Sequence, residues 1–179
     1  MAMAQSLQEL VALGVIFSVP IALLLEGAEA SNELPSFKEH QFSYYVQLQT
    51  GGAPNLGILR PPINTTISAN FGSSTIFAFN VTESELRTSK SLGLIRGYTV
   101  ETSYVSGDMR LLEVEFLQYD DGRYKGTVQY QGAVTSTGTE LAIVGGSCSF
   151  RGVRGYVVVN FISSVPPFST YRHDVTLLE

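Results

Sequence analysis

The sequence predicts an all-β fold, either a closed antiparallel barrel or a sandwich of two sheets. About eight short segments alternate between apolar and polar side chains or are rich in β-branched and aromatic residues. Glycine, proline and aspartate turn signals separate them, and no stretch has convincing helical periodicity. A closed barrel of about eight strands has an interior that holds one small ligand. A sandwich with the same number of strands fits the pattern equally well.

The composition indicates one domain with a well-packed core. A domain of about 150 residues buries roughly 70% of its unfolded surface, and this chain has 179 residues. Charged residues make up 15% and hydrophobic residues 44%, which argues against disorder. The formal net charge is −5 and the Lys and Arg residues are scattered, so the sequence offers no basic surface for a nucleic acid.

The single cysteine, Cys148, excludes an intrachain disulfide. With only His40 and His173 beside it, the chain has too few soft ligands for a structural zinc site. No phosphate-binding glycine motif is matched either. We therefore predict neither a metal nor a cofactor.

Residues 1–30 are predicted to be a signal peptide. The apolar run from Val11 to Leu25 suits a signal core and is shorter than the roughly twenty residues that span a bilayer, and an A-x-A site ends at Ala30. The segment before the run contains Glu9 and no Lys or Arg, so an uncleaved membrane anchor is the alternative. A polar linker, 31–40, then leads to the predicted domain, 41–179.

The first predicted strand, 41–49, alternates with period two. Its apolar face carries Phe42, Tyr44, Val46 and Leu48. Glycines 51 and 52 end the strand, and the prolines after Arg60 predict a loop because proline cannot donate to a ladder. Two N-x-[ST] sequons, at Asn64 in that loop and at Asn80, are predicted glycosylation sites if the chain is secreted.

Seven further strands are predicted from the same composition. A Gly107-Asp108 hairpin and an Asp120 to Arg123 hairpin separate three of them, and a glycine-rich turn from Gly145 to Gly155 separates two more. The predicted strands are Thr75–Val81, Leu92–Ser103, Arg110–Tyr119, Tyr124–Tyr130, Leu141–Val144, Val157–Phe161 and Thr170–Leu178.

Few polar residues stand out as chemical groups. Glu113 and Glu115 share one strand face while apolar side chains occupy the other, which favours a solvated outer face for the two acids. His40 and His173 are isolated, and we predict that they are structural or solvated. An aromatic ligand would find stacking partners among the strand tyrosines Tyr45, Tyr98 and Tyr130.

The stretch from Ile143 to Tyr156 reads I-V-G-G-S-x-x-F-x-x-x-R-G-Y and resembles the signature of the plant dirigent proteins. The resemblance continues, in the same order, through Arg96-Gly97 and Tyr124-Lys-Gly-Thr127. It implies an eight-stranded antiparallel up-and-down β-barrel, similar to the allene oxide cyclase barrel. It also implies secretion to the apoplast and assembly as a homo-oligomer, a dimer or a trimer. Secretion together with the two sequons would make the chain a glycoprotein.

The resemblance also implies a function in lignan biosynthesis and plant defence. Dirigent proteins direct the stereoselective coupling of two phenoxyl radicals, typically from coniferyl alcohol, while a separate oxidase of laccase or peroxidase type makes the radicals. Other members close quinone methides to pterocarpan-type rings. Such chemistry needs an aromatic-shaped cavity and an acid that protonates the quinone methide oxygen. The protein is then a stereo-directing auxiliary without oxidase activity of its own.

Positions can be carried over one by one. The family's first-strand acid falls on Gln47, and the arginine before the I-V-G-G stretch falls on Thr139. Glu140 is the acid that remains, so it is the expected catalytic residue. The expected ligand-binding residues are Tyr45, Gln47, Tyr98 and Thr139. These features look similar to the dirigent domains that are fused to jacalin-type lectins in grasses.

Two other functions stay open. A non-catalytic module that binds a phenolic or the cell wall in defence is favoured by Gln47 and Thr139, which stand where the family has ionisable groups. A barrel isomerase acting on an oxylipin would need a long apolar tunnel. A filled interior would favour the binding module, whereas polar groups around an aromatic-sized space would favour stereo-directing chemistry.

Overall fold

The computed structural model describes residues 37–178 apart from 51–55, 67, 106–109 and 136. The predicted signal peptide and the Gly107-Asp108 hairpin therefore lie outside the described residues. The strands in chain order are β1 (Glu39–Gln49), β2 (Leu56–Arg60), β3 (Ser74–Thr82), β4 (Ser91–Glu101), β5 (Arg110–Asp120), β6 (Lys125–Thr135), β7 (Gly138–Cys148), β8 (Arg154–Val165) and β9 (Phe168–Leu178).

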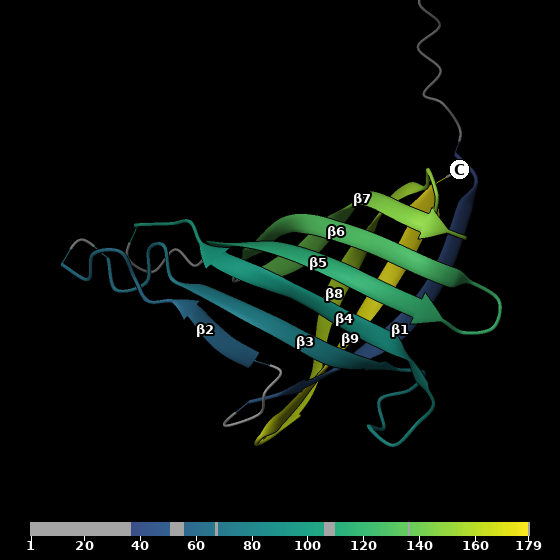
Figure 1. The fold of residues 1–179 in the computed structure, drawn as a ribbon, viewed down its shortest axis with the longest axis horizontal. Helices are drawn as coiled ribbons and strands as arrows, with labels where there is room; N and C mark the ends of the chain where they lie inside the picture. Colours follow the sequence, from purple (N-terminus) through teal and green to yellow (C-terminus); the bar gives the residue numbers. More distant parts are fainter. Residues whose placement is uncertain (1–36, 51–55, 67, 106–109, 136, 179) are drawn as a thin grey trace, which may run out of the picture. The chain divides into compact units, whose positions relative to one another are not determined.

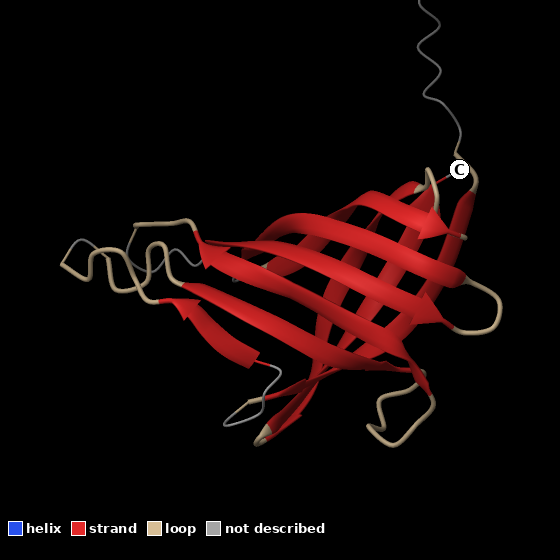
Figure 2. Ribbon diagram, in the orientation of Figure 1, coloured by secondary structure: helices blue, strands red, loops and turns tan. Residues whose placement is uncertain are grey.

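Eight of these strands close into an antiparallel barrel, so the predicted fold class is confirmed and the sandwich is excluded. The ring runs β1-β9-β8-β7-β6-β5-β4-β3 and closes where β1 pairs with β3 through Tyr45–Thr82 and Gln47–Asn80. β2 pairs with β3 outside the ring, next to the barrel (Figure 1). Figure 2 shows strands and loops but no helix in the described part of the chain.

The eight predicted strands are all present, and two details differ. The sequence did not predict β2, because its five residues lie between glycine-rich and proline-rich stretches that read as loop. The predicted glycine-rich turn is shorter than expected, since β7 continues through Gly145 and Gly146 to Cys148. Within the described residues, no helix is long and apolar enough to cross a membrane.

Ring contacts fill one end of the barrel. Phe42 lies near the start of β1, and its ring centroid is 5.3 Å from that of Tyr119, 5.7 Å from Tyr124 and 6.1 Å from Phe150. Phe150 folds back over this end because Gly146 has no side chain: a Cβ there would lie 2.8 Å from the Phe150 Cβ. The glycine pair of the signature stretch therefore has a packing role. We call this region the aromatic end.

Candidate functional site

A cavity of about 280 Å³ lies inside the barrel beyond the aromatic end. Its apolar lining comes mainly from β1, with Val46 and Leu48, and from β3, with Phe77 and Phe79; single residues such as Val159 of β8 complete it. Its polar lining consists of Thr75, Thr99, Glu113, Glu115, Thr139, Tyr171 and His173. Small-ligand pockets usually measure about 300–1,000 Å³ and combine apolar walls with a few polar groups. The cavity is therefore of a size for one aromatic ring with short substituents.

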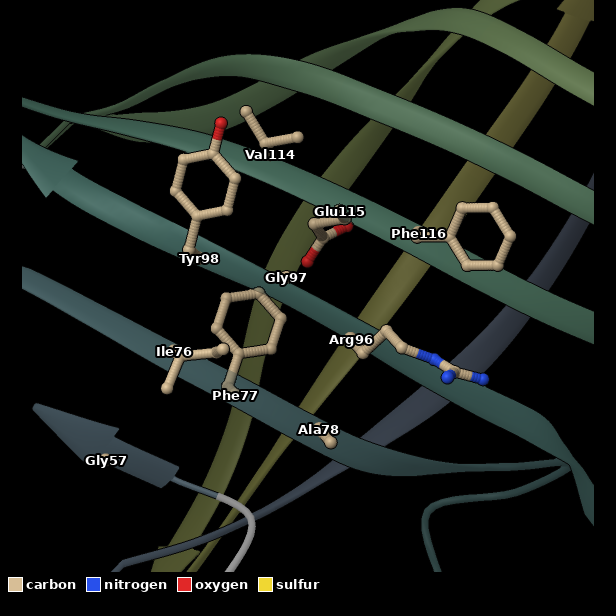
Figure 3. A pocket seen from close by; sticks show the side chains of 10 residues that line it. All are labelled: Gly57, Ile76, Phe77, Ala78, Arg96, Gly97, Tyr98, Val114, Glu115 and Phe116. Atoms are coloured by element: carbon tan, nitrogen blue, oxygen red, sulfur yellow. The ribbon is translucent and has the colours of Figure 1, made fainter. Parts of the chain in front are cut away.

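Two stacked rings form one wall of the cavity. The Phe77 and Phe79 ring centroids are 5.0 Å apart with an interplanar angle of 4°. Phe77 reaches this position over Gly97 of β4, where an added Cβ would lie 2.9 Å from its Cζ atom and would overlap the Val114 carbonyl oxygen. Figure 3 shows the Phe77 ring beside Gly97. The absence of a side chain at Gly97 thus shapes the cavity.

Two carboxyl groups enter the cavity from β5. Glu113 and Glu115 both line it, and only 5% of Glu115 is exposed to solvent. The expectation of a solvated outer face was wrong, because alternation places these acids on the same interior face as Leu117 and Tyr119. The Oε2 atom of Glu115 is buried and has no hydrogen-bond partner. A buried oxygen without a partner is rare and costly, so it is a candidate contact for a ligand.

Burial raises the pKa of both carboxyl groups. The pKa of Glu113 rises to about 7. The pKa of Glu115 is raised well above its ordinary value, first by burial and second by the negative charge of Glu113. A carboxyl group with a raised pKa keeps its proton in mildly acidic solution and donates a hydrogen bond or a proton. Glu115 is therefore a neutral acid in mildly acidic solution, and it faces a cavity whose walls are partly apolar and partly polar.

The opposite wall is neutral. β9 is four places from β5 in the ring of eight, so His173 faces the cavity from the side opposite the two acids. Burial lowers the pKa of the His173 imidazole to about 3, which keeps it uncharged. Its Nδ1 atom is 3.1 Å from the Tyr44 hydroxyl, which in turn lies 3.3 Å from the Tyr130 hydroxyl. His173, expected to be structural or solvated, is buried.

The predicted site residues do not come together. Thr139 lies on the interior face of β7, where it lines the cavity. Glu140, next to it, lies exposed on the outer face of β7. Tyr45 lies half-buried on the outer face of β1. The expected role of Glu140 as acid in the cavity therefore has no geometric support, and the acids at the cavity are those on β5.

Gln47 is buried outside the cavity in a network between three segments. Its Nε2 donates to the Thr82 Oγ1 at 2.9 Å and to the Glu85 carbonyl oxygen at 3.2 Å. Its Oε1 accepts from the Thr170 Oγ1 at 3.0 Å. All of the polar atoms of the Gln47 amide group thus bind protein groups. The network ties the segment after β3 to β1 and β9, where β1 closes the barrel.

Tyr98 lies on the outside of the barrel, 41% exposed, beside a shallow groove of about 520 Å³. Figure 3 shows the side chains of this groove: Ile76 from β3, Arg96 from β4, and Val114 and Phe116 from β5. The groove is mainly apolar; its charged or chargeable residues are Arg96, whose guanidinium carbon lies 5.9 Å from the Phe116 ring centroid, and Glu115. The groove opens on the outer surface, and it shares Phe77 and Glu115 with the lining of the interior cavity.

Both sequon asparagines are exposed. Asn64 lies in the loop after β2, where its Oδ1 accepts from the Thr66 backbone N–H at 2.9 Å. Asn80 lies within β3, where its Oδ1 accepts from the Ser91 hydroxyl at 2.8 Å. The third residue of the second sequon, Thr82, is fully buried. Asn64 is therefore the more accessible of the two.

The arrangement brings a neutral acid, a neutral imidazole and stacked aromatic rings to one small space. Among the described residues that line the cavity there is no Lys or Arg. In the described part of the chain, no group of three or more His, Cys, Asp and Glu side chains is placed to hold a metal ion. The cavity can hydrogen-bond to, and protonate, an oxygen atom of a small aromatic ligand.

The comparisons with known proteins agree with this architecture. The model of the family described as "Dirigent-like protein" matches residues 40–178. The chain is 29% identical to Dirigent protein 7 of Arabidopsis thaliana over 117 residues, 64% of this chain and 61% of that protein, less than two thirds of its length. It is also 29% identical to Pterocarpan synthase 1 of Glycine max over 139 residues, 73% of this chain and 74% of that protein.

Solved structures are similar as well. The pterocarpan synthase dirigent protein PsPTS1 superposes with a TM-score of 0.67 at 25% identity, covering 82% of this chain and 98% of that one. The pterocarpan synthase dirigent protein GePTS1 superposes with the same TM-score at 23% identity, covering 82% and 88%, and supports the fold.

Proposed function

Because the chain belongs to the dirigent-like protein family, we propose that it binds a small phenolic in the barrel cavity and biases the stereochemistry of its coupling. The reaction proposed first is the coupling of phenoxyl radicals from a monolignol such as coniferyl alcohol. A separate oxidase of laccase or peroxidase type supplies the radicals. The observation that carries the proposal is the unpartnered, buried Oε2 of Glu115, at a cavity walled by Phe77 and Phe79.

The proposed step follows from these groups. Two phenoxyl radicals combine to form one carbon–carbon bond and leave quinone methides. The protonated carboxyl group of Glu115 hydrogen-bonds to the oxygen of a quinone methide and donates its proton to that oxygen as a hydroxyl group attacks the methide carbon from one face. The attacking hydroxyl group loses its own proton to water, and Glu115 takes a proton back from water, so protons balance. The cavity has the volume for one phenolic, so the second radical or the attacking group approaches at its mouth. Fixing one partner is sufficient to select a face.

Chiral chromatography tests this function. Coniferyl alcohol is coupled by a one-electron oxidant with and without stoichiometric protein, and the enantiomeric excess of the product is measured. We expect an excess with the unmodified protein and a racemic product with Glu115→Gln, because an amide cannot deliver a proton. A racemic product from the folded, unmodified protein would refute the proposal for this substrate.

A second function, binding of a phenolic without catalysis, is favoured by Thr139 in the cavity wall, where the resemblance places an arginine. Binding of coniferyl alcohol in calorimetry without any enantiomeric excess would select it. The oxylipin isomerase is less favoured, because the polar groups that line the cavity do not suit a long apolar chain.

Location and assembly complete the proposal. We propose that the chain is secreted to the apoplast, that Asn64 carries a glycan, and that copies of the chain associate as a dimer or a trimer. The exposed apolar groove beside Ile76 and Tyr98 supports association, because a partner would remove it from water. Light scattering on secreted protein, before and after glycosidase treatment, measures both the number of copies and the glycan.

A further inference from the structure

The described residues around the cavity offer no positive charge to bind the carboxylate of a ligand. Glu113 and Glu115 are the charged or chargeable acids of its lining, and the described lining contains no Lys or Arg. The facing imidazole of His173 is neutral, and its Nδ1 lies within hydrogen-bond distance of the Tyr44 hydroxyl. The cavity is therefore neutral or negative at every pH above about 3, where the imidazole of His173 is uncharged because burial lowers its pKa. An anionic ligand would bring a second negative charge to a buried site without a counter-charge.

The same groups suit a cation. The Oε2 of Glu115 is already removed from water and has no partner, so an ammonium group that donates to it restores a hydrogen bond that folding left unmade. Glu113 lies two residues away on the same face of β5 and offers a second acceptor. The stacked rings of Phe77 and Phe79, together with Tyr171, give the cavity aromatic walls, and aromatic faces attract cations.

We propose that the preferred ligand of the cavity is a small aromatic amine, bound as its ammonium ion between Glu113 and Glu115. This inference rests on the proposed function only in taking the barrel cavity as the ligand site. It names the substrate class of that site: a phenolic that carries an amine, in preference to a neutral phenolic alcohol, with phenolic acids excluded. The volume of about 280 Å³ limits the ligand to one ring with a short side chain.

The titratable groups around the site fix the pH dependence. β5 contributes Glu113 and Glu115, β9 contributes His173 and Tyr171, and burial raises the pKa of Tyr171. The buried hydroxyls of Tyr44 on β1 and Tyr130 on β6 also have raised pKa values, so these groups stay neutral near pH 7. On β4, the Glu101 carboxylate accepts from the backbone N–H groups of Ser103 and Arg110, and the Arg96 side chain is on the outer face.

The two carboxyl groups on β5 therefore control cation binding. Their protons compete with the ammonium group, so affinity for an amine rises with pH through about 7, where Glu113 titrates. Below that pH the affinity falls by up to about tenfold per pH unit for each proton released. Affinity for a neutral phenolic alcohol does not follow this curve.

Isothermal titration calorimetry of the secreted protein tests the inference with three ligands that share a 4-hydroxyphenyl ring: tyramine, tyrosol and 4-hydroxyphenylacetate. They carry an ammonium group, a hydroxyl group and a carboxylate. At pH 8 we expect tyramine to bind about tenfold or more tightly than tyrosol, with no measurable binding of the acid. The tyramine enthalpy should differ between Tris and phosphate buffers because binding releases a carboxyl proton, and that of tyrosol should not.

Variants locate the effect. Glu115→Gln and, separately, Glu113→Gln should reduce the tyramine preference to about twofold or less, because each removes an ionisable partner. Glu39→Gln is the matched control, since Glu39 is exposed at the start of β1, and it should leave all three affinities unchanged. Equal or tighter binding of tyrosol, binding of the acid, or a tyramine preference that survives both cavity variants would overturn the inference.

The outcome separates the two proposals. Enantiomeric excess with coniferyl alcohol and no tyramine binding would refute the amine and keep the stereo-directing function. Tyramine binding with a racemic coupling product would refute the stereo-directing function for coniferyl alcohol and keep the amine as the ligand. If none of the three ligands binds and the product is racemic, the cavity is not a ligand site and both proposals fall.

Discussion

The two ends of the barrel interior use the same strands for opposite purposes. At the aromatic end, Phe42, Tyr119, Tyr124 and Phe150 fill the space with ring contacts of 5.3–6.1 Å to Phe42. Beyond it, the same strand β5 presents Glu113 and Glu115 to a cavity. Figure 1 shows the β5–β6 turn at one end of the barrel and the start of β5 at the other.

The difference teaches how a small barrel combines stability with a site. Packed rings supply the burial that stabilises the closed sheet. Buried carboxyl groups without a counter-charge oppose folding once they ionise. The burial at the aromatic end thus offsets the cost of burying Glu113 and Glu115 at the other end, which we call the acidic end. Substitutions at each end should therefore have distinct effects.

The largest effect is expected at the aromatic end. Phe150→Ala should lower the free energy of unfolding by about 3–5 kcal/mol, because it empties a fully buried ring position. Urea unfolding followed by circular dichroism measures this change. Phe161→Ala, at an exposed ring on β8, is the control and should change it by less than about 1 kcal/mol. Equal losses for both variants would refute the division between the ends.

The next effect is the pH dependence that the acidic end creates. The folded protein holds protons on Glu113 and Glu115 that the unfolded chain releases, so the contribution of these two groups to stability is fully present below about pH 4.5 and decreases as pH rises. The buried neutral imidazole of His173 opposes this trend up to about pH 6.5, because the unfolded chain protonates it there and the folded protein does not. For Glu113, whose pKa rises from 4.5 to about 7, the loss is about 3 kcal/mol across this interval. Urea midpoints at several pH values measure it.

Glutamine variants identify the groups responsible. Glu113→Gln and Glu115→Gln should each flatten part of the decrease, since an amide does not ionise. If the pH dependence of stability were the same in the unmodified protein and in both glutamine variants, the two carboxyl groups would not be buried as described.

A smaller effect is expected where the sheet shapes the cavity. Gly97→Ala should cost about 1–3 kcal/mol, because its Cβ would overlap the Val114 carbonyl oxygen and push Phe77 away from Phe79. Ligand affinity should fall with it. Gly57→Ala is the matched control, since its Cβ would meet only the Ile76 side chain at 4.0 Å. Unchanged ligand binding in Gly97→Ala would remove Phe77 from the cavity wall.

The smallest effect is expected outside the barrel. Glu140→Gln should change stability by less than about 0.5 kcal/mol and leave any enantiomeric excess unchanged, because Glu140 is exposed on the outer face of β7. Chiral chromatography beside Glu115→Gln makes the comparison. A racemic product with Glu140→Gln alone would return the acid role to Glu140.

The sequence by itself determined the eight strands of the barrel and the family, although it did not predict β2. Alternation in β1 places Phe42, Tyr44, Val46 and Leu48 on the interior face, and the structure confirms it. The turn signal from Asp120 to Arg123 marks the β5–β6 hairpin, where the Asp121 carboxylate accepts from two backbone N–H groups. These features are local, since side-chain alternation and turn chemistry depend on neighbours in the chain.

Only the tertiary structure decided which face of β5 points inward and which residues meet. Along β5 each face carries apolar residues: Leu117 and Tyr119 share one face with Glu113 and Glu115, and Leu112, Val114 and Phe116 occupy the other. Alternation therefore does not decide which of the two faces points inward. Likewise, the exposure of Glu140 and the approach of His173 to the cavity depend on barrel closure, which joins strands far apart in the sequence. The physical reason is that burial, which raises or lowers a pKa, belongs to the assembled barrel and not to any one strand.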